Sequence, residues 1–197
     1  MKPVDHGHYR TANTHIIEQG GSMANPTCSA KLPYTLTTPR LHVCRPDLAL
    51  APHLHQALLA SYALHQPFLI WAKPDWTLEQ IEQGLEESQG DFHTPTGEKR
   101  YFVLKPNTGE LIGCIGLTPR AEEYEVGYWV SQGFAGKGLM REALNTLLDA
   151  VDAAVWLTTA ADNTASQRLA ERAGFSRVGE APRPNDPATQ GLLYRRG

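Results

Sequence analysis

Residues 131–144 read SQGFAGKGLMREAL, a stretch that places three glycines within six residues directly before the start of a helix. From Met140 the apolar residues recur with the spacing of an amphipathic helix, at Ala143, Leu144, Leu147, Leu148 and Val151. A glycine-rich turn at a helix start leaves several backbone N–H groups free and pointing in one direction. Such a group of donors attracts an anion, usually a phosphate. The segment therefore predicts a strand–turn–helix unit whose turn either binds a phosphate or is a plain connection.

Two well-known phosphate motifs do not fit this turn. A Walker loop needs four residues between its first glycine and the Gly-Lys pair, whereas Gly133 and Gly136 are separated by only two. A dinucleotide fingerprint needs a third glycine where Arg141 stands. The turn is therefore neither of these sites, and the class of its ligand must come from other parts of the chain.

Composition narrows the class of protein. A chain of 197 residues with 41% hydrophobic content can bury one sizeable core, and a net charge of −3 provides no basic surface for nonspecific nucleic-acid binding. The three cysteines, Cys28, Cys44 and Cys114, are too few and too scattered for a disulfide framework or a zinc cluster. No apolar run approaches the roughly 18 residues of a membrane span. We expect a cytoplasmic protein that needs no metal and binds neither nucleic acid nor membrane.

The composition changes near residue 34. Gly, Ser, Asn, Thr, Pro and His dominate residues 1–33, which predicts a flexible N-terminal tail, and Met23 within it is an alternative start of the chain. Residues 34–197 are expected to form a single domain.

Strands and helices alternate along that domain. The pattern predicts strands at 35–46, 99–106, 110–119, 124–130, 155–160, 175–181 and 190–196. Helices are expected at 48–61, at 77–89 with Thr77 and Gln80 as a capping box, after the glycine turn, and from 164 to a stop at Gly174, with Thr164 and Gln167 as its capping pair. Residues 107–109 are expected to form the turn of a hairpin. This order predicts an α+β fold.

Four phrases of the chain resemble a known family. They are TPRLHVCRP at 38–46, PFLIWA at 67–72, EVGYWV with GKGLMREAL within 125–144, and ADNTASQRLAERAGF at 161–175. In this order they resemble the GNAT acetyltransferases, and more narrowly the RimJ/RimL-type enzymes that acetylate protein N-termini. The resemblance implies a GNAT fold in three layers, with a mixed, mostly antiparallel sheet of about 6–7 strands flanked by about four helices. It also implies acetyl-CoA as co-substrate, with no metal.

The resemblance assigns the coenzyme site residue by residue. The pyrophosphate would be bound by the backbone N–H groups of Gly136, Lys137, Gly138, Leu139 and Met140. The strand residues Tyr128, Trp129 and Val130 would splay from the neighbouring strand, offer backbone groups to the pantetheine arm, and place an N–H near Val130 on the thioester oxygen. Asn163 would contact the pantetheine and Ser166 would lie near the sulfur, although both could simply be polar residues of a helix N-terminus. Ala135 and Met140 depart from the family pattern, in which Arg or Gln and Gly or Ala are common there.

The implied chemistry is direct attack of a neutral amine on the thioester. At pH 7 an α-amine with a pKa of about 7.8 costs about 1 kcal/mol to deprotonate, whereas a lysine near 10.4 costs about 4.6 kcal/mol. Strand alternation puts Glu125 on one face with Gly127 and Trp129, so Glu125 is the candidate base, acting directly or through a water. Glu123 shares this face and is the reserve. For both carboxylates the alternative is an exposed, solvated side chain. Ser166, or else Tyr128, would protonate the leaving thiolate.

The acceptor side is less constrained. By resemblance, Phe68 and Trp71 would line the acceptor cleft with Glu123, although Trp71 could equally be a core residue. The acceptor is left open among a peptide N-terminus, a small-molecule amine and a toxin, and so is the choice between monomer and homodimer. Two other hypotheses also remain: a degenerate acetyltransferase fold that only binds or senses coenzyme A, and an unrelated αβ interaction protein.

Overall fold

The computed structural model describes residues 32–183 and 186–196, without the side chains of residues 183 and 186–189. The N-terminal tail expected at residues 1–33 falls almost wholly outside the described residues, so the tail and its boundary stay predictions. Leu32 and Pro33 are described, and both contact the domain. Leu32 packs against the larger hydrophobic core, and the hydroxyl of Tyr101 donates a hydrogen bond to the carbonyl of Pro33 at 2.8 Å.

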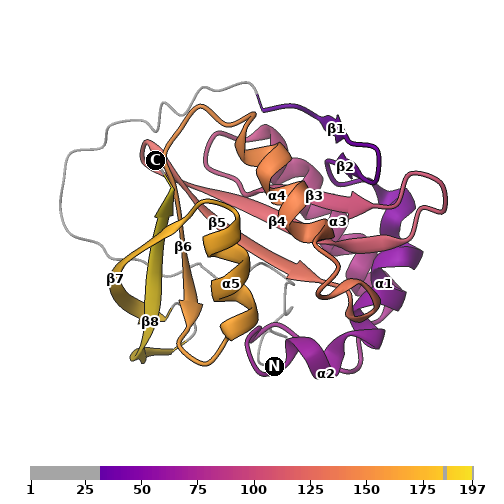
Figure 1. The fold of residues 1–197 in the computed structure, drawn as a ribbon. Helices are drawn as coiled ribbons and strands as arrows, with labels where there is room; N and C mark the ends of the chain where they lie inside the picture. The colour runs from indigo at the N-terminus through magenta and orange to yellow at the C-terminus, as the bar shows by residue number, and fades with distance from the viewer. Residues whose placement is uncertain (1–31, 184–185, 197) are drawn as a thin grey trace, which may run out of the picture.

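The described residues form an eight-stranded sheet in the order β1-β2-β3-β4-β5-β6-β8-β7 (Figure 1). The strands are β1 Thr35–Thr37, β2 His42–Cys44, β3 Lys99–Leu104, β4 Leu111–Arg120, β5 Glu123–Val130, β6 Val155–Ala160, β7 Ser176–Arg183 and β8 Asp186–Arg196. Only β5 and β6 run parallel; the other neighbours pair antiparallel. The expected α+β class with a mixed, mostly antiparallel sheet is confirmed.

The sheet has one strand more than the sequence pattern indicated, because the segment 35–46 is not a single strand. The chain folds back at Pro39, and β1 and β2 pair with each other. The hydroxyl of Thr38 accepts hydrogen bonds from the N–H groups of Arg40 and Leu41, at 3.2 and 3.0 Å. The same hydroxyl donates to Glu142, at 2.5 Å, which ties this turn to the helix that follows the glycine loop.

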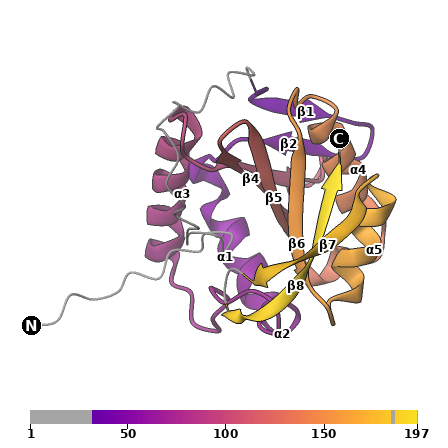
Figure 2. The ribbon, with the colours of Figure 1, turned by 90° about the vertical axis from the view of Figure 1, so that its left-hand side faces the viewer.

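Helices cover both faces of the sheet. They are η1 Leu48–Leu50, α1 Ala51–Ala60, α2 Tyr62–His65, α3 Leu78–His93, η2 Gln132–Phe134, α4 Leu139–Leu148 and α5 Thr164–Arg172. Figure 2 shows α1 and α3 on one side of the sheet and α4 and α5 on the other. The expected three layers are therefore present. None of the helices in the described part of the chain is long and apolar enough to cross a lipid bilayer.

Local signals explain most helix ends. Thr77 and Gln80 form the expected capping box at the start of α3. The start of α5 differs from the prediction, because Asn163 is its N-cap and accepts a hydrogen bond from the N–H of Ser166 at 3.1 Å. Gln167 does not reach back to cap this helix; its side-chain amide donates instead to two carbonyls at the end of β6 and just after it. Gly174, with φ +87°, ends α5 as expected.

Helix α4 buries the stripe that the sequence predicts, and it begins at Leu139. Its buried residues are Leu139, Met140, Ala143, Leu144, Leu147 and Leu148. The bulk of Met140 is accommodated by Gly113 on β4, where an added Cβ would lie 2.5 Å from the terminal methyl of Met140. Glycine at 113 therefore leaves the space that the Met140 side chain fills next to β4.

Truncating this stripe should destabilise the fold. Leu144 is fully buried in the larger core, so Leu144→Ala is expected to lower the free energy of unfolding by about 2–5 kcal/mol. Leu59 on α1 is 37% exposed, so Leu59→Ala is the matched control and should cost about 1 kcal/mol or less. Denaturant unfolding of both variants measures the difference. Equal losses would show that α4 does not carry the core.

Candidate active site

Strands β5 and β6 are paired at one end and apart at the other. Their register contains only two pairs, Tyr124 with Val155 and Glu125 with Trp156. β5 continues to Val130, and β6 continues beside β8, without further pairing between these two described strands. The parallel strands therefore diverge after Glu125, which confirms the splay expected for residues 128–130.

The hydrogen-bond pattern of β5 shows which backbone groups face this gap. Ser131 donates its N–H to Ile112 at 2.8 Å on the β4 side, whereas Tyr124 donates to a carbonyl just before β6 at 3.0 Å. In an antiparallel ladder, successive residues direct their N–H and C=O groups to alternate sides. Tyr128 and Val130 share the parity of Tyr124, so their backbone groups point away from β4 and into the gap.

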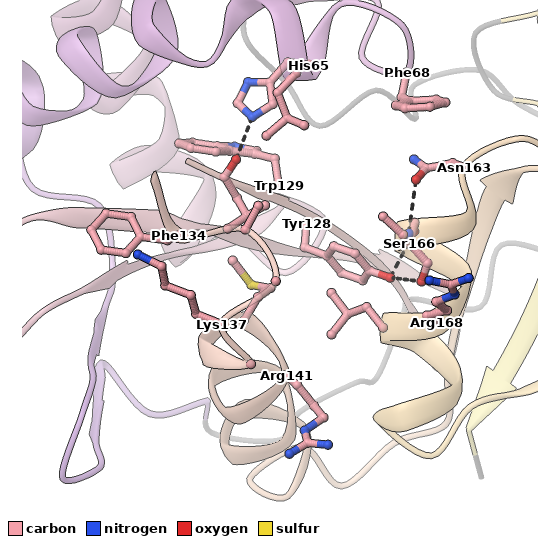
Figure 3. A pocket seen from close by; sticks show the side chains of 18 of the residues that line it. His65, Phe68, Tyr128, Trp129, Phe134, Lys137, Arg141, Asn163, Ser166 and Arg168 are labelled. Atoms are coloured by element: carbon pink, nitrogen blue, oxygen red, sulfur yellow. Dashed lines mark hydrogen bonds between the residues drawn. The ribbon is translucent and has the colours of Figure 1, made fainter. Parts of the chain in front are cut away.

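A cavity of about 620 Å³ lies at this gap (Figure 3). Its walls come from α2 and the loop after it, the end of β5, the glycine turn with the start of α4, and α5. Ten predicted site residues line it: Phe68, Tyr128, Trp129, Val130, Gly136, Lys137, Gly138, Met140, Asn163 and Ser166. Four do not: Trp71, Glu123, Glu125 and Leu139. The structure thus brings together most of the coenzyme residues and separates them from the carboxylates.

The glycine turn has the geometry of an anion site. Gly136 and Gly138 adopt the left-handed region, with φ +75° and +74°, which favours glycine. Gly138 is the N-cap of α4 and supplies no side-chain acceptor, so the N–H groups of the first helical turn remain available. An added Cβ at either glycine would meet nothing within 4 Å. The turn therefore leaves open space in front of a helix N-terminus, where a phosphate group fits.

The charge of the cavity supports the same conclusion. The cavity is lined by four cationic side chains: Lys137, Arg141, Arg168 and Arg172. No aspartate or glutamate is among its described lining residues. The chain as a whole has a net charge of −3, so this lining is a local concentration of positive charge. Positive charge concentrated in a cavity favours a ligand that carries several negative charges.

A hydroxyl pair closes one side of the cavity. The hydroxyl of Tyr128 lies 3.1 Å from both the carbonyl oxygen and the Oγ of Ser166, across the gap on α5 (Figure 3). Burial raises the pKa of Tyr128 to about 12, so the phenol stays protonated at neutral pH. Asn163 fixes the backbone beside it through its bond to the N–H of Ser166. The pair can therefore donate a proton, directly or in relay, to a group held in the gap.

Glu125 is buried, so the alternative interpretation of Glu125 as an exposed, solvated carboxylate is wrong. Its exposed fraction is 3%, and Arg120 contacts Oε2 through Nε at 3.0 Å and through Nη2 at 2.9 Å. Burial raises the pKa of Glu125 to about 7, against the opposing effect of Arg120. The alternation of β5 places it on the side of Trp129, which packs with α1 and α3, and opposite to Tyr128. Glu123 matches the solvated alternative better, because its side chain is 33% exposed and pairs with Arg195 at 2.7 Å.

The acceptor-side residues divide into two groups. Phe68 lines the cavity from the loop after α2. Trp71 packs beside Trp129, with ring centroids 6.4 Å apart, and beside His65 at 6.1 Å. Trp71 lies against the smaller core, as its core interpretation requires, and its role toward an acceptor stays a prediction.

His65 is a cavity residue that the sequence analysis did not find. It is buried and its Nε2 lies 2.9 Å from the carbonyl oxygen of Val130 (Figure 3). Since a carbonyl only accepts, Nε2 must carry the proton, and burial lowers the pKa of His65, which favours the neutral ring. A contact between residues 65 positions apart leaves no local signal. Arg168 and Arg172 were also missed, although their spacing of four on an expected helix indicates a shared face.

Two parallel strands that diverge beside a basic cavity, with a helix N-terminus at one end, are typical of proteins that bind a phosphate-bearing coenzyme. Within this class the chain belongs to the acetyltransferase (GNAT) domain family, whose profile matches residues 40–176. The protein is therefore an acetyltransferase, and enzymes of this family use acetyl-CoA. In the described residues no group of three or more His, Cys, Asp or Glu side chains could hold a metal ion.

Solved structures with the same fold include other acetyltransferases. The microcin C7 self-immunity acetyltransferase MccE, in complex with acetyl-CoA and AMP, has a TM-score of 0.74 at 18% identity, over 85% of this chain and 98% of that one. RimL, the ribosomal L7/L12 α-N-protein acetyltransferase, in complex with coenzyme A, has a TM-score of 0.69 at 23% identity, over 84% and 96%. An acetyltransferase from Salmonella typhimurium that modifies the N-terminal serine of L7/L12 has a TM-score of 0.65 at 22% identity, over 84% and 97%. A search of curated proteins found no match. At these identities the likeness concerns the fold.

Proposed function

We propose that the protein transfers the acetyl group of acetyl-CoA to a primary amine, either a protein or peptide N-terminus or a small-molecule amine, by direct attack on the thioester. The observation that carries this proposal is the cavity, in which two left-handed glycines and four cationic side chains are present and no carboxylate is among the described lining residues. Its lining also includes Tyr128, Trp129 and Val130, where β5 has separated from β6. This combination suits a long ligand with phosphates at one end and a carbonyl group at the other.

The coenzyme would lie along the turn and the gap. N–H groups of Gly136 to Met140 would bind the pyrophosphate, and the backbone groups of Tyr128 and Val130 would bind the pantetheine arm and the thioester oxygen. The departure at Met140 does not block this arrangement, because its side chain packs beneath the turn against Gly113 and its N–H stays available.

The proton chemistry would use both sides of β5. Glu125 lies on the α1/α3 side, where its pKa of about 7 suits a base that works at neutral pH, acting through a water because Glu125 does not line the cavity. Tyr128 and Ser166 lie on the α4/α5 side, where a proton can be donated to the departing thiolate. The amine would thus approach from the Glu125 side and the thiolate would leave toward Ser166.

A second candidate is a coenzyme-A-binding or sensing module without turnover. It is favoured by the position of Glu125, which is bound to Arg120 and lies outside the cavity lining. The N-terminal-acetylating RimJ/RimL-type specificity, the cytoplasmic location and a homodimer likewise stay predictions.

Release of free thiol from acetyl-CoA tests the proposal. The full chain is mixed with acetyl-CoA and a panel of α-amino peptides, small amines and lysine side-chain analogues. We expect acceptor-dependent thiol release, faster with α-amines than with lysine analogues at pH 7, because the α-amine costs less to deprotonate. Binding of acetyl-CoA without acceptor-dependent release from any member of the panel would favour the sensing module.

A further inference from the structure

We infer that Arg168 and Arg172 form a second phosphate site on α5, which binds the 3′-phosphate of the coenzyme and lets the protein distinguish coenzyme A from its dephospho form. This inference rests on the proposed function. It names a specificity determinant that is separate from the backbone donors of the glycine turn.

The two arginines are placed as a pair. They stand one helical turn apart on α5, so they share a face, and both line the cavity. Figure 3 shows Arg168 on α5, across the cavity from Lys137 and Arg141, which belong to the turn and the start of α4. The cavity thus has positive charge on two separate walls.

Neither arginine is neutralised within the described chain. Three other arginines near the C-terminus have carboxylate partners: Arg177 with Glu180, Arg195 with Glu123, and Arg196 with Asp149. Among the described residues no carboxylate lies within salt-bridge distance of Arg168 or Arg172. Two guanidinium groups on one helix face repel each other when no described carboxylate of the cavity lining lies between them, and a bound anion removes that cost.

Coenzyme A carries phosphate groups at two separate places, and the cavity has cationic side chains on two separate walls. A pyrophosphate at the N-terminus of α4 is served by backbone N–H groups and by the cations of that wall. Coenzyme A carries a further phosphate monoester on its ribose, which is close to doubly charged at pH 7. Guanidinium groups bind such an oxyanion through paired hydrogen bonds, and two of them match its charge. Arg168 and Arg172 are the cations that remain for it.

Calorimetric titration with two ligands tests this assignment. Acetyl-CoA and acetyl-dephospho-CoA differ only in the 3′-phosphate. The wild-type chain should bind acetyl-CoA at least about tenfold more tightly. In the Arg168→Ala, Arg172→Ala double variant this ratio should fall close to one, mainly through weaker acetyl-CoA binding. Arg177→Ala is the matched control, because it removes an exposed arginine outside the cavity, and it should keep the wild-type ratio.

Three results would decide against parts of the account. A wild-type ratio near one overturns the second site. Equal weakening of both ligands in the double variant also overturns it, because the arginines would then serve the pyrophosphate. Absence of binding of either ligand to the wild-type chain contradicts the proposed function itself. If the double variant fails to fold by circular dichroism, Arg172→Gln provides the same comparison with a smaller change.

Discussion

Replacing Glu125 by glutamine is expected to lower kcat at neutral pH by about a hundredfold or more, while the Kd for acetyl-CoA stays close to wild type. Glutamine preserves the shape of the buried side chain but cannot accept the proton of the amine. Glu125 lies outside the cavity lining, so its substitution should not change the glycine turn that is proposed to bind the pyrophosphate. Steady-state thiol release and calorimetry measure the two quantities separately.

The pH dependence of this variant gives an independent readout. The wild-type rate should rise with pH through neutrality, because Glu125, with its pKa of about 7, and the attacking amine both lose their protons in that range. The deficit of Glu125→Gln should shrink at high pH, where the amine is already neutral. A deficit that stays constant across the range would indicate a structural role for Glu125.

Two further variants complete this test. Glu123→Gln is the matched control, since Glu123 is partly exposed and paired with Arg195, and it should keep close to wild-type kcat. Ser166→Ala should cost less than Glu125→Gln, because water can protonate a thiolate whose pKa is near 8.5. Wild-type turnover in Glu125→Gln combined with a loss in Glu123→Gln would transfer the role of base to Glu123.

Replacing Gly138 by valine should weaken acetyl-CoA binding at least about tenfold, which corresponds to about 1.4 kcal/mol. Gly138 has φ +74°, a conformation that a β-branched residue adopts only with strain, and its backbone would have to approach the pyrophosphate closely. In the free chain an added Cβ at this position meets nothing within 4 Å. The loss should therefore arise from the altered turn and from contact with the ligand, and the packed core should remain intact.

Gly109 provides the matched control for that variant. It has φ +68° in the hairpin between β3 and β4, and an added Cβ there also meets nothing within 4 Å. Gly109→Val therefore carries a similar backbone strain but lies outside the cavity. Melting temperatures should fall by similar amounts in the two variants, whereas only Gly138→Val should lose affinity. An unchanged Kd for folded Gly138→Val would contradict the phosphate assignment of the turn.

Much of the fold could be predicted because the relevant signals are local. The hairpin around Gly109, the capping box at Thr77 and the apolar stripe of α4 each depend on residues within a few positions of one another. The break between β1 and β2 has a local signal in Pro39, whereas the contact of Thr38 with Glu142, which attaches the turn to α4, is long-range. A pattern of residue types does not reveal such a partner.

For the candidate site, the sequence predicted which residues take part better than it predicted their burial and long-range contacts. The resemblance located the glycine turn and the splayed strand, and strand alternation gave the side of β5 on which Glu125 lies. Alternation could not show that Glu125 is buried against Arg120, since burial depends on the layer formed by α1 and α3. The contact of His65 with Val130 joins two distant segments and has no counterpart in the local sequence.

The central claim is that the acetyl group passes from acetyl-CoA to an amine without first residing on the protein. A single-turnover experiment with acetyl-CoA labelled in its acetyl group tests it most directly. The full chain is mixed with a stoichiometric amount of the labelled coenzyme, first alone and then with an accepted amine, and each sample is separated into protein and small molecules. We predict no label on the protein before the amine is added and complete transfer of label to the amine afterwards. Label that is stably bound to the protein and then chased into the amine would contradict direct attack, and label that never reaches an amine would contradict the proposed function.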